Sequence, residues 1–173
     1  MDTFFEQIVA IRKTGKSMLA IIGIWLAFII VAYLLFLVGG AFPSFFSIFM
    51  LLIIGAAWGA FKLTRMFSIE YEYIITNGSF DVDKITAQSS RKRMMSFEIA
   101  NVQAVEKFNP NAMPSGNFEK TLIACDTTDP NAYYIIVSEE GKGTRLLVFA
   151  PDERIKGAIK KFLPRYMSTS AFN

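Results

Sequence analysis

Hydrophobic residues follow two patterns along this chain, continuous in its first third and alternating afterwards. Residues 17–61 contain no Asp, Glu, Lys or Arg. A charged side chain is costly at the centre of a bilayer, so a charge-free stretch of this length is typical of a membrane-embedded segment. A helix needs about 20 apolar residues to cross the hydrocarbon core. The pattern therefore predicts two spanning helices, residues 17–38 and residues 45–61.

The connection between the two spans, GGAFPS at residues 39–44, contains two glycines and Pro43. Glycines favour release of a helix and proline discourages its continuation, which predicts a tight turn between antiparallel helices. Small residues with helical spacing can allow close helix approach. We expect such packing within the hairpin, with dimerisation as the alternative. The residues concerned are Gly23, Ala27, Gly55 and Gly59.

Residues 1–16, MDTFFEQIVAIRKTGK, precede the first span. Their apolar side chains recur at roughly helical spacing and are followed by basic residues, which predicts a short amphipathic helix at the membrane surface.

Basic residues lie before the first span and after the second, at the open end of the hairpin, and not in the loop between the spans. Arg12, Lys13 and Lys16 precede the first span, Lys62 and Arg65 follow the second, and the loop between the spans carries no charge. The positive-inside rule then predicts that both termini lie in the cytoplasm.

After Met66 the apolar residues alternate with polar ones. Tyr73 and Ile75 fall on one face of a predicted strand and Glu72 on the other, and the Asn77-Gly78 pair that follows is a strong hairpin signal. A polar connection at residues 86–93 and a loop at residues 109–117 separate the later strands. Further strands are expected at residues 79–85, 94–108 (one or two strands), 121–127, 132–138 and 144–149.

A helix is predicted to close the domain. Pro151 suits the first helical position, Pro164 ends the helix, and Ile155, Ile159 and Phe162 form an apolar face that requires a sheet to cover it. We therefore expect a domain at residues 68–164 and a tail at residues 165–173.

Three stretches carry a resemblance to a known family: YEYIITNGSFDVDKI, RKRMMSFEIANVQAVEKF and LLVFAPDERIKGAIKKFLP. In this pattern the chain resembles the bacterial pleckstrin-homology-like (PH-like) membrane proteins, in which such a domain follows a transmembrane hairpin. The resemblance implies a membrane-anchored α+β protein of the bacterial cytoplasmic membrane. Its domain would be an antiparallel β-sandwich or barrel capped by a C-terminal helix. No catalytic residues come with the resemblance.

The chain has few of the side chains and motifs on which catalytic sites are usually built. The chain has no histidine and one cysteine, Cys125, and it lacks phosphate-binding glycine loops and zinc-ligand spacings. Asp81 and Asp83 share a strand face and are interpreted as solvated acids. We therefore expect no enzyme activity, no cofactor and no metal, and the net charge of +3 gives no case for nucleic acid.

The densest run of basic residues is Arg91, Lys92 and Arg93. Such a run can contact anionic lipid headgroups, and the alternative is a solvated loop. Phosphoinositide recognition by a long basic loop is not expected, because the Asn77-Gly78 turn replaces that loop.

The loop at residues 109–118 is the predicted site for a protein partner, since loops on a rigid scaffold often carry binding. Its candidate residues are Asn109, Met113 and Phe118, and an ordinary connector is the alternative.

Three functions remain open. The first is a membrane-localised adaptor or scaffold for a protein partner or for self-assembly into a homo-oligomer. The second is a sensor of anionic membrane lipids, and the third is a pore or transporter component built from hairpin oligomers.

Overall fold

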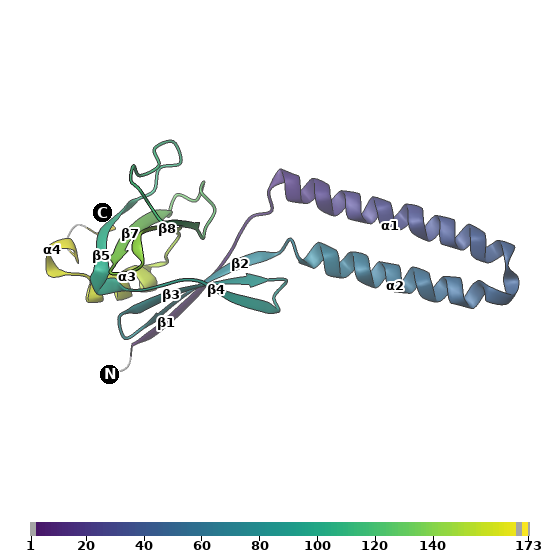
Figure 1. Ribbon diagram of the computed structural model, residues 1–173, viewed down its shortest axis with the longest axis horizontal. Helices are drawn as coiled ribbons and strands as arrows, with labels where there is room; N and C mark the ends of the chain where they lie inside the picture. Colours follow the sequence, from purple (N-terminus) through teal and green to yellow (C-terminus); the bar gives the residue numbers. More distant parts are fainter. Residues whose placement is uncertain (1–2, 169–170, 173) are drawn as a thin grey trace. The chain divides into compact units, whose positions relative to one another are not determined.

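The computed structural model describes residues 3–168 and 171–172. The chain divides into two units. One is a helical hairpin, Arg12–Ser68, and the other is a β domain built from Met1–Ile11 together with Ile69–Asn173 (Figure 1).

The hairpin consists of α1 (Gly15–Ala41), a short 3-10 helix η1 (Pro43–Phe45) and α2 (Phe46–Arg65). Both long helices have the length and apolar character needed to cross a membrane, and they run antiparallel in Figure 1. Against expectation, α1 continues through the glycines at 39 and 40 and ends at Ala41. Pro43 then begins the 3-10 turn, so proline rather than glycine marks the break.

The helices approach each other closely at a glycine that the spacing argument did not select. A Cβ on Gly39 would lie 3.0 Å from the Cβ of Phe49, whereas no atom lies within 4 Å of the corresponding position on Gly23, Gly55 or Gly59. Ala27 is also exposed. The prediction that these four residues pack the hairpin together is therefore wrong, because the close approach of the two helices lies at Gly39 instead.

The first sheet contains four antiparallel strands in chain order: β1 (Phe4–Ala10), β2 (Ile69–Thr76), β3 (Ser79–Thr86) and β4 (Ser90–Glu98). The amphipathic helix predicted for residues 1–16 is thus wrong over β1. Its sequence FFEQIVA also has a period of two, and Gln7 aligns with Tyr73 when β1 pairs with β2. Pairing satisfies the backbone and buries part of Phe5 and Val9 against the core, which a helix at this place would not do.

The β2–β3 turn has the predicted form, with Asn77 at φ 51° and Gly78 at φ 95°. These positive values at both central positions are typical of the hairpin turn that Asn-Gly favours. The next connection is shorter than expected. Residues 87–89 form the whole turn, and β4 begins at Ser90 within the stretch predicted to be a polar loop.

The second sheet has the order β5-β7-β8-β6. Its strands are β5 (Val102–Lys107), β6 (Lys120–Ile123), β7 (Tyr133–Glu139) and β8 (Gly143–Phe149), and a 3-10 turn, η2 (Ile99–Asn101), joins β4 to β5. β6 runs parallel to β8, while the other pairs are antiparallel.

The larger of two clusters of buried residues forms the core between the sheets. Tyr73, Phe80 and Phe149 are fully buried there and contact one another through edge-on or tilted rings. The Tyr73 hydroxyl donates to the carbonyl of Ala124 at 2.8 Å and accepts from the N–H of Ala150 at 3.3 Å, which links β2 to the second sheet. The predicted sandwich is confirmed.

The closing helix is α3 (Glu153–Phe162), and Ile155 and Ile159 are buried on its inner face. Asp152 caps it by accepting from the N–H of Ile155 at 2.8 Å, so Pro151 precedes the cap rather than occupying the first turn. Residues beyond Pro164 also belong to the domain. A short helix, α4 (Arg165–Ser168), follows, and Met167 lies in the core.

Candidate interaction site

Charged residues from three strands meet on the outer face of the first sheet. Arg91 of β4 lies 2.8 Å through Nη2 from both carboxylate oxygens of Glu72 on β2. Arg93 contacts two acids of β3: its Nη1 lies 2.9 Å from Asp81 and its Nε lies 2.9 Å from Asp83. The result is a ladder of ion pairs across β2, β3 and β4.

A β-bulge makes this arrangement possible. Val82 aligns with Met95 and the next residue, Asp83, aligns with Arg93, so Met94 is an extra residue in β4. Strict alternation would place Arg93 and Met95 on the same face. The bulge reverses the alternation between them, so that Met95 is buried in the core while Arg93 faces the acids.

The ion pairs of this ladder change the interpretation of the basic run Arg91-Lys92-Arg93 as a lipid-headgroup contact. Two of its three cations are engaged by carboxylates, and Lys92 belongs to the opposite face of the strand, aligned with Lys84. Asp83, which was expected to be solvated, is buried, and so is Glu72 on β2. The run is a strand rather than a loop, and its three charges do not form one headgroup site.

Burial raises the pKa of Glu72, and a hydrogen bond with Glu6 adds to this, against the opposing charge of Arg91. A pKa that is higher in the folded state stabilises the protein fully below the unfolded value, about 4.3, and this contribution is lost as the pH rises through the folded value.

We expect the free energy of unfolding of Glu72→Gln to depend less on pH than that of the wild type, between the unfolded and folded pKa values of Glu72. Urea unfolding followed by near-ultraviolet circular dichroism at several pH values would measure this. The exposed variant Glu140→Gln should behave as wild type, and an unchanged slope in Glu72→Gln would contradict the assignment.

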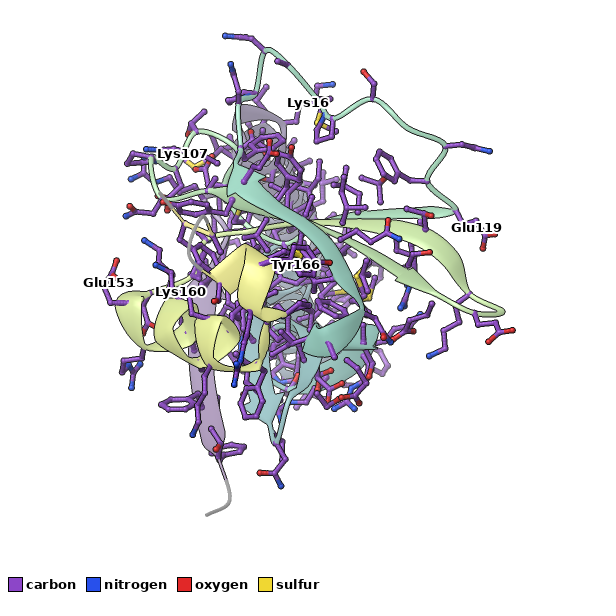
Figure 2. All side chains as sticks on the ribbon, turned by 90° about the vertical axis from the view of Figure 1, so that its left-hand side faces the viewer. Lys16, Lys107, Glu119, Glu153, Lys160 and Tyr166 are labelled. Atoms are coloured by element: carbon purple, nitrogen blue, oxygen red, sulfur yellow. The ribbon has the colours of Figure 1, made fainter. Side chains whose placement is uncertain are left out.

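A groove of about 420 Å³ lies between β1 and α3. Figure 2 shows α3, with Glu153 labelled at one end, lying across the purple strand β1. The groove is bounded on the strand side by Phe4 and Phe5, while Gly157 and Ala158 of α3 lie opposite. Most of its lining is apolar.

β1 itself is an edge strand, since among the described residues it pairs with β2 alone. Phe4 and Ile8 on its outer face are 62% and 54% exposed. Exposed apolar residues on an unpaired edge are uncommon in soluble domains, because such an edge is a template for another strand.

The predicted partner loop does not contribute to this groove. Asn109 accepts from the N–H of Asn111 within its own turn, Met113 is exposed, and Phe118 packs against a small second cluster of buried residues. Sequence reasoning missed β1. Its alternating pattern was a usable signal, but the helical spacing of the same residues competed with it.

Groups that could support chemistry lie apart from the groove. Burial raises the pKa of the Cys125 thiol to about 12, which keeps it protonated at neutral pH. Asp126 and Asp129 each accept a backbone N–H two residues later, from Thr128 and Asn131. In the described part of the chain, His, Cys, Asp and Glu form no group of three suited to a metal ion.

Fold and hairpin together define a class: a PH-like sandwich closed by a C-terminal helix, in a chain with two membrane-length helices. The chain belongs to the family described as bacterial PH-like domain (DUF6106), whose model matches residues 1–169. The resemblance stated from the sequence is thereby confirmed. Searches of curated proteins and of solved structures give no match.

Proposed function

We propose that this chain is a non-enzymatic membrane protein that presents its PH-like domain as an adaptor or scaffold at the bacterial cytoplasmic membrane. Both termini lie in the cytoplasm, as the basic flanks of the hairpin indicate. The domain binds a protein partner or another copy of the chain.

The connections between the helices and the domain carry this proposal. Residues 11–14 join β1 to α1, and residues 66–68 join α2 to β2. Ala10 pairs with Glu70, so both connections leave the sheet at the same end. A fully extended residue spans about 3.5 Å, so two such short tethers keep the domain near the membrane and suit a localising role.

The interior of the domain also favours binding at its surface. Large side chains such as Tyr73, Phe80 and Phe149 fill the core. The buried carboxylates of Glu72 and Asp83 are engaged by arginines. Neither feature offers a reactive group to a substrate, which supports a non-enzymatic role.

Lipid sensing is the second candidate. Lys160 and Lys161 lie in the last turn of α3, and Arg165 begins α4 three residues after α3 ends. No carboxylate pairs with any of the three within residues 3–168 and 171–172. Each basic residue near an anionic surface contributes roughly 1 kcal/mol, so this group is a better lipid candidate than Arg91 and Arg93.

Affinity purification in a mild detergent tests the adaptor proposal. The full-length chain would be compared with a hairpin fragment, Arg12–Ser68, and co-purifying proteins identified by mass spectrometry. We expect at least one protein to be retained by the full-length chain alone. If the two samples retain the same proteins, the adaptor role is wrong. Salt-sensitive binding of the full-length protein to anionic vesicles, with no retained protein, would favour the lipid role instead.

A further inference from the structure

We infer that the free edge of β1, with the groove beside α3, receives an extended segment of a protein partner that adds a strand to the first sheet. This inference rests on the proposed adaptor function and names the surface that performs it. Three independent features carry it: the backbone of β1, the shape of the groove and its charge.

Backbone N–H and C=O groups of β1 point away from β2. The N–H of Asn77 donates to the carbonyl of Thr3, and the N–H of Ile11 donates to the carbonyl of Ile69. Bonded pairs alternate in an antiparallel ladder, so the odd-numbered residues of β1 bond to β2. The N–H and C=O groups of Phe4, Glu6, Ile8 and Ala10 consequently point towards the open edge. No strand in the described part of the chain covers this edge.

The groove has room for the side chains of an added strand. No atom lies within 4 Å of the place where a Cβ on Gly157 would stand. Next to it, Ala158 contributes only a methyl group to the lining. Alternate side chains of a strand paired with β1 would point towards Gly157 and Ala158 in the groove. The others would lie beside Phe4 and Ile8 on the outer face of the sheet.

Charge at the groove favours an acidic segment. Glu153 is paired with Lys156 at 2.9 Å, and Arg154 is held by Asp152 at 2.9 Å. Lys161 also lines the groove, and no carboxylate pairs with it in the described part of the chain. The occupant is therefore an extended segment of a partner, apolar at alternate positions, with a carboxylate placed against Lys161.

Full-length protein in lipid nanodiscs would be screened against a displayed library of random peptides of about 12 residues, a length that spans one strand and its flanks. We expect the selected peptides to alternate apolar and polar residues and to include Asp or Glu. The tightest peptide would then be synthesised and titrated against variants.

Gly157→Trp is the main variant, because it fills the groove from an exposed helix position where the backbone has room for a side chain. We expect it to weaken binding by about 10-fold or more, and Gly157→Ala, the matched control, by no more than about threefold. Lys161→Glu should weaken binding of acidic peptides, and Ile8→Pro should remove one outward N–H of the edge. An unchanged urea midpoint would show that each variant is folded.

Amide hydrogen exchange supplies a second measurement that does not depend on a variant. Peptide binding should slow the exchange of the N–H groups of Glu6 and Ile8 on the open edge. Equal affinity of wild type and Gly157→Trp, or unprotected edge amides in the complex, would overturn the inference. It would also be overturned if no library peptide binds, or if a peptide of residues 3–12 binds best and the protein is dimeric, since this would assign the edge to a second copy.

The inference can fail while the adaptor function stands. If Gly157→Trp still retains the protein co-purified with the full-length chain, the groove is wrong and the adaptor role survives. If the full-length chain retains no protein that the hairpin lacks, the adaptor role itself is wrong.

Discussion

Replacing Phe80 by Ala is expected to lower the free energy of unfolding of the β domain by about 3–5 kcal/mol, the range typical of large-to-small changes at buried aromatic residues. Phe80 is fully buried at the centre of the core. Its ring centroid lies 5.2 Å from that of Phe97 in its own sheet and 5.7 Å from that of Phe149 in the other. Removing the ring leaves a cavity between the two sheets that neither can fill without moving.

Pulse proteolysis of the full-length protein in detergent, over a series of urea concentrations, would measure this loss. Phe4→Ala is the matched control, because Phe4 is largely exposed on the outer face of β1 and its truncation should cost well under about 1 kcal/mol. Similar urea midpoints for the two variants would show that Phe80 does not hold the sheets together.

The second large effect is expected at Arg145. Its replacement by Met should lower the free energy of unfolding by about 3 kcal/mol, the lower end of the range for breaking a buried ion pair. The Arg145 side chain is 9% exposed. Its Nη2 lies 2.6 Å from Glu139, and its Nη1 donates to the carbonyl of Ser96 on β4 at 3.2 Å. Arg145 thus joins the second sheet to the first, and methionine cannot replace either contact.

Lys142→Met provides the control for this prediction, because Lys142 contacts the same Glu139 carboxylate at 3.1 Å with a side chain that is 62% exposed. A surface pair of this kind contributes about 0–1 kcal/mol. The same urea measurement would compare the two variants. Equal losses would mean that the burial of Arg145, and its bond to β4, add nothing to the pair.

The pKa of Glu139 offers a check on the same contact. Burial acts to raise it, but hydrogen bonds from Lys142 and from the N–H of Glu98, together with the charge of Arg145, lower it below the ordinary value. A lowered folded-state pKa stabilises the domain above the unfolded value, and this stabilisation is lost as the pH falls through the folded value. Losing Arg145 therefore removes part of the stability that the ionised Glu139 contributes at neutral pH.

The position of β1 has a practical consequence for work on the domain. A fragment that begins at residue 68 lacks β1, although β1 pairs with residues 70–76 of β2. Gln7 of β1 also donates to the carbonyl of Ala150 and accepts from the N–H of Asp152. A fragment that stops at residue 164 also loses Met167 from the core. Experiments on the full-length chain avoid both losses.

Local sequence determined much of this architecture. The charge-free run of residues 17–61 yields two membrane-length helices because each helix satisfies its own backbone groups, whatever surrounds it. Asn77-Gly78 makes the predicted turn because both residues tolerate positive φ. Alternation in β2 places Tyr73 and Ile75 in the core, as the period of two requires.

Other features depended on contacts between distant segments. FFEQIVA is compatible with either a helix or a strand, and the free edge of β2, whose residues pair with it from 60 or more positions away, decides for the strand. The bulge at Met94 turns Arg93 from the core face to the acids of β3, which no alternation rule in RKRMMSF indicates. The sequence by itself therefore determined the two membrane-length helices, the turn and the sandwich, because these depend on local backbone preference and hydrophobic period. Only the tertiary structure decided which strand forms the open edge and which charges are neutralised, because pairing and burial are properties of segments brought together by the fold.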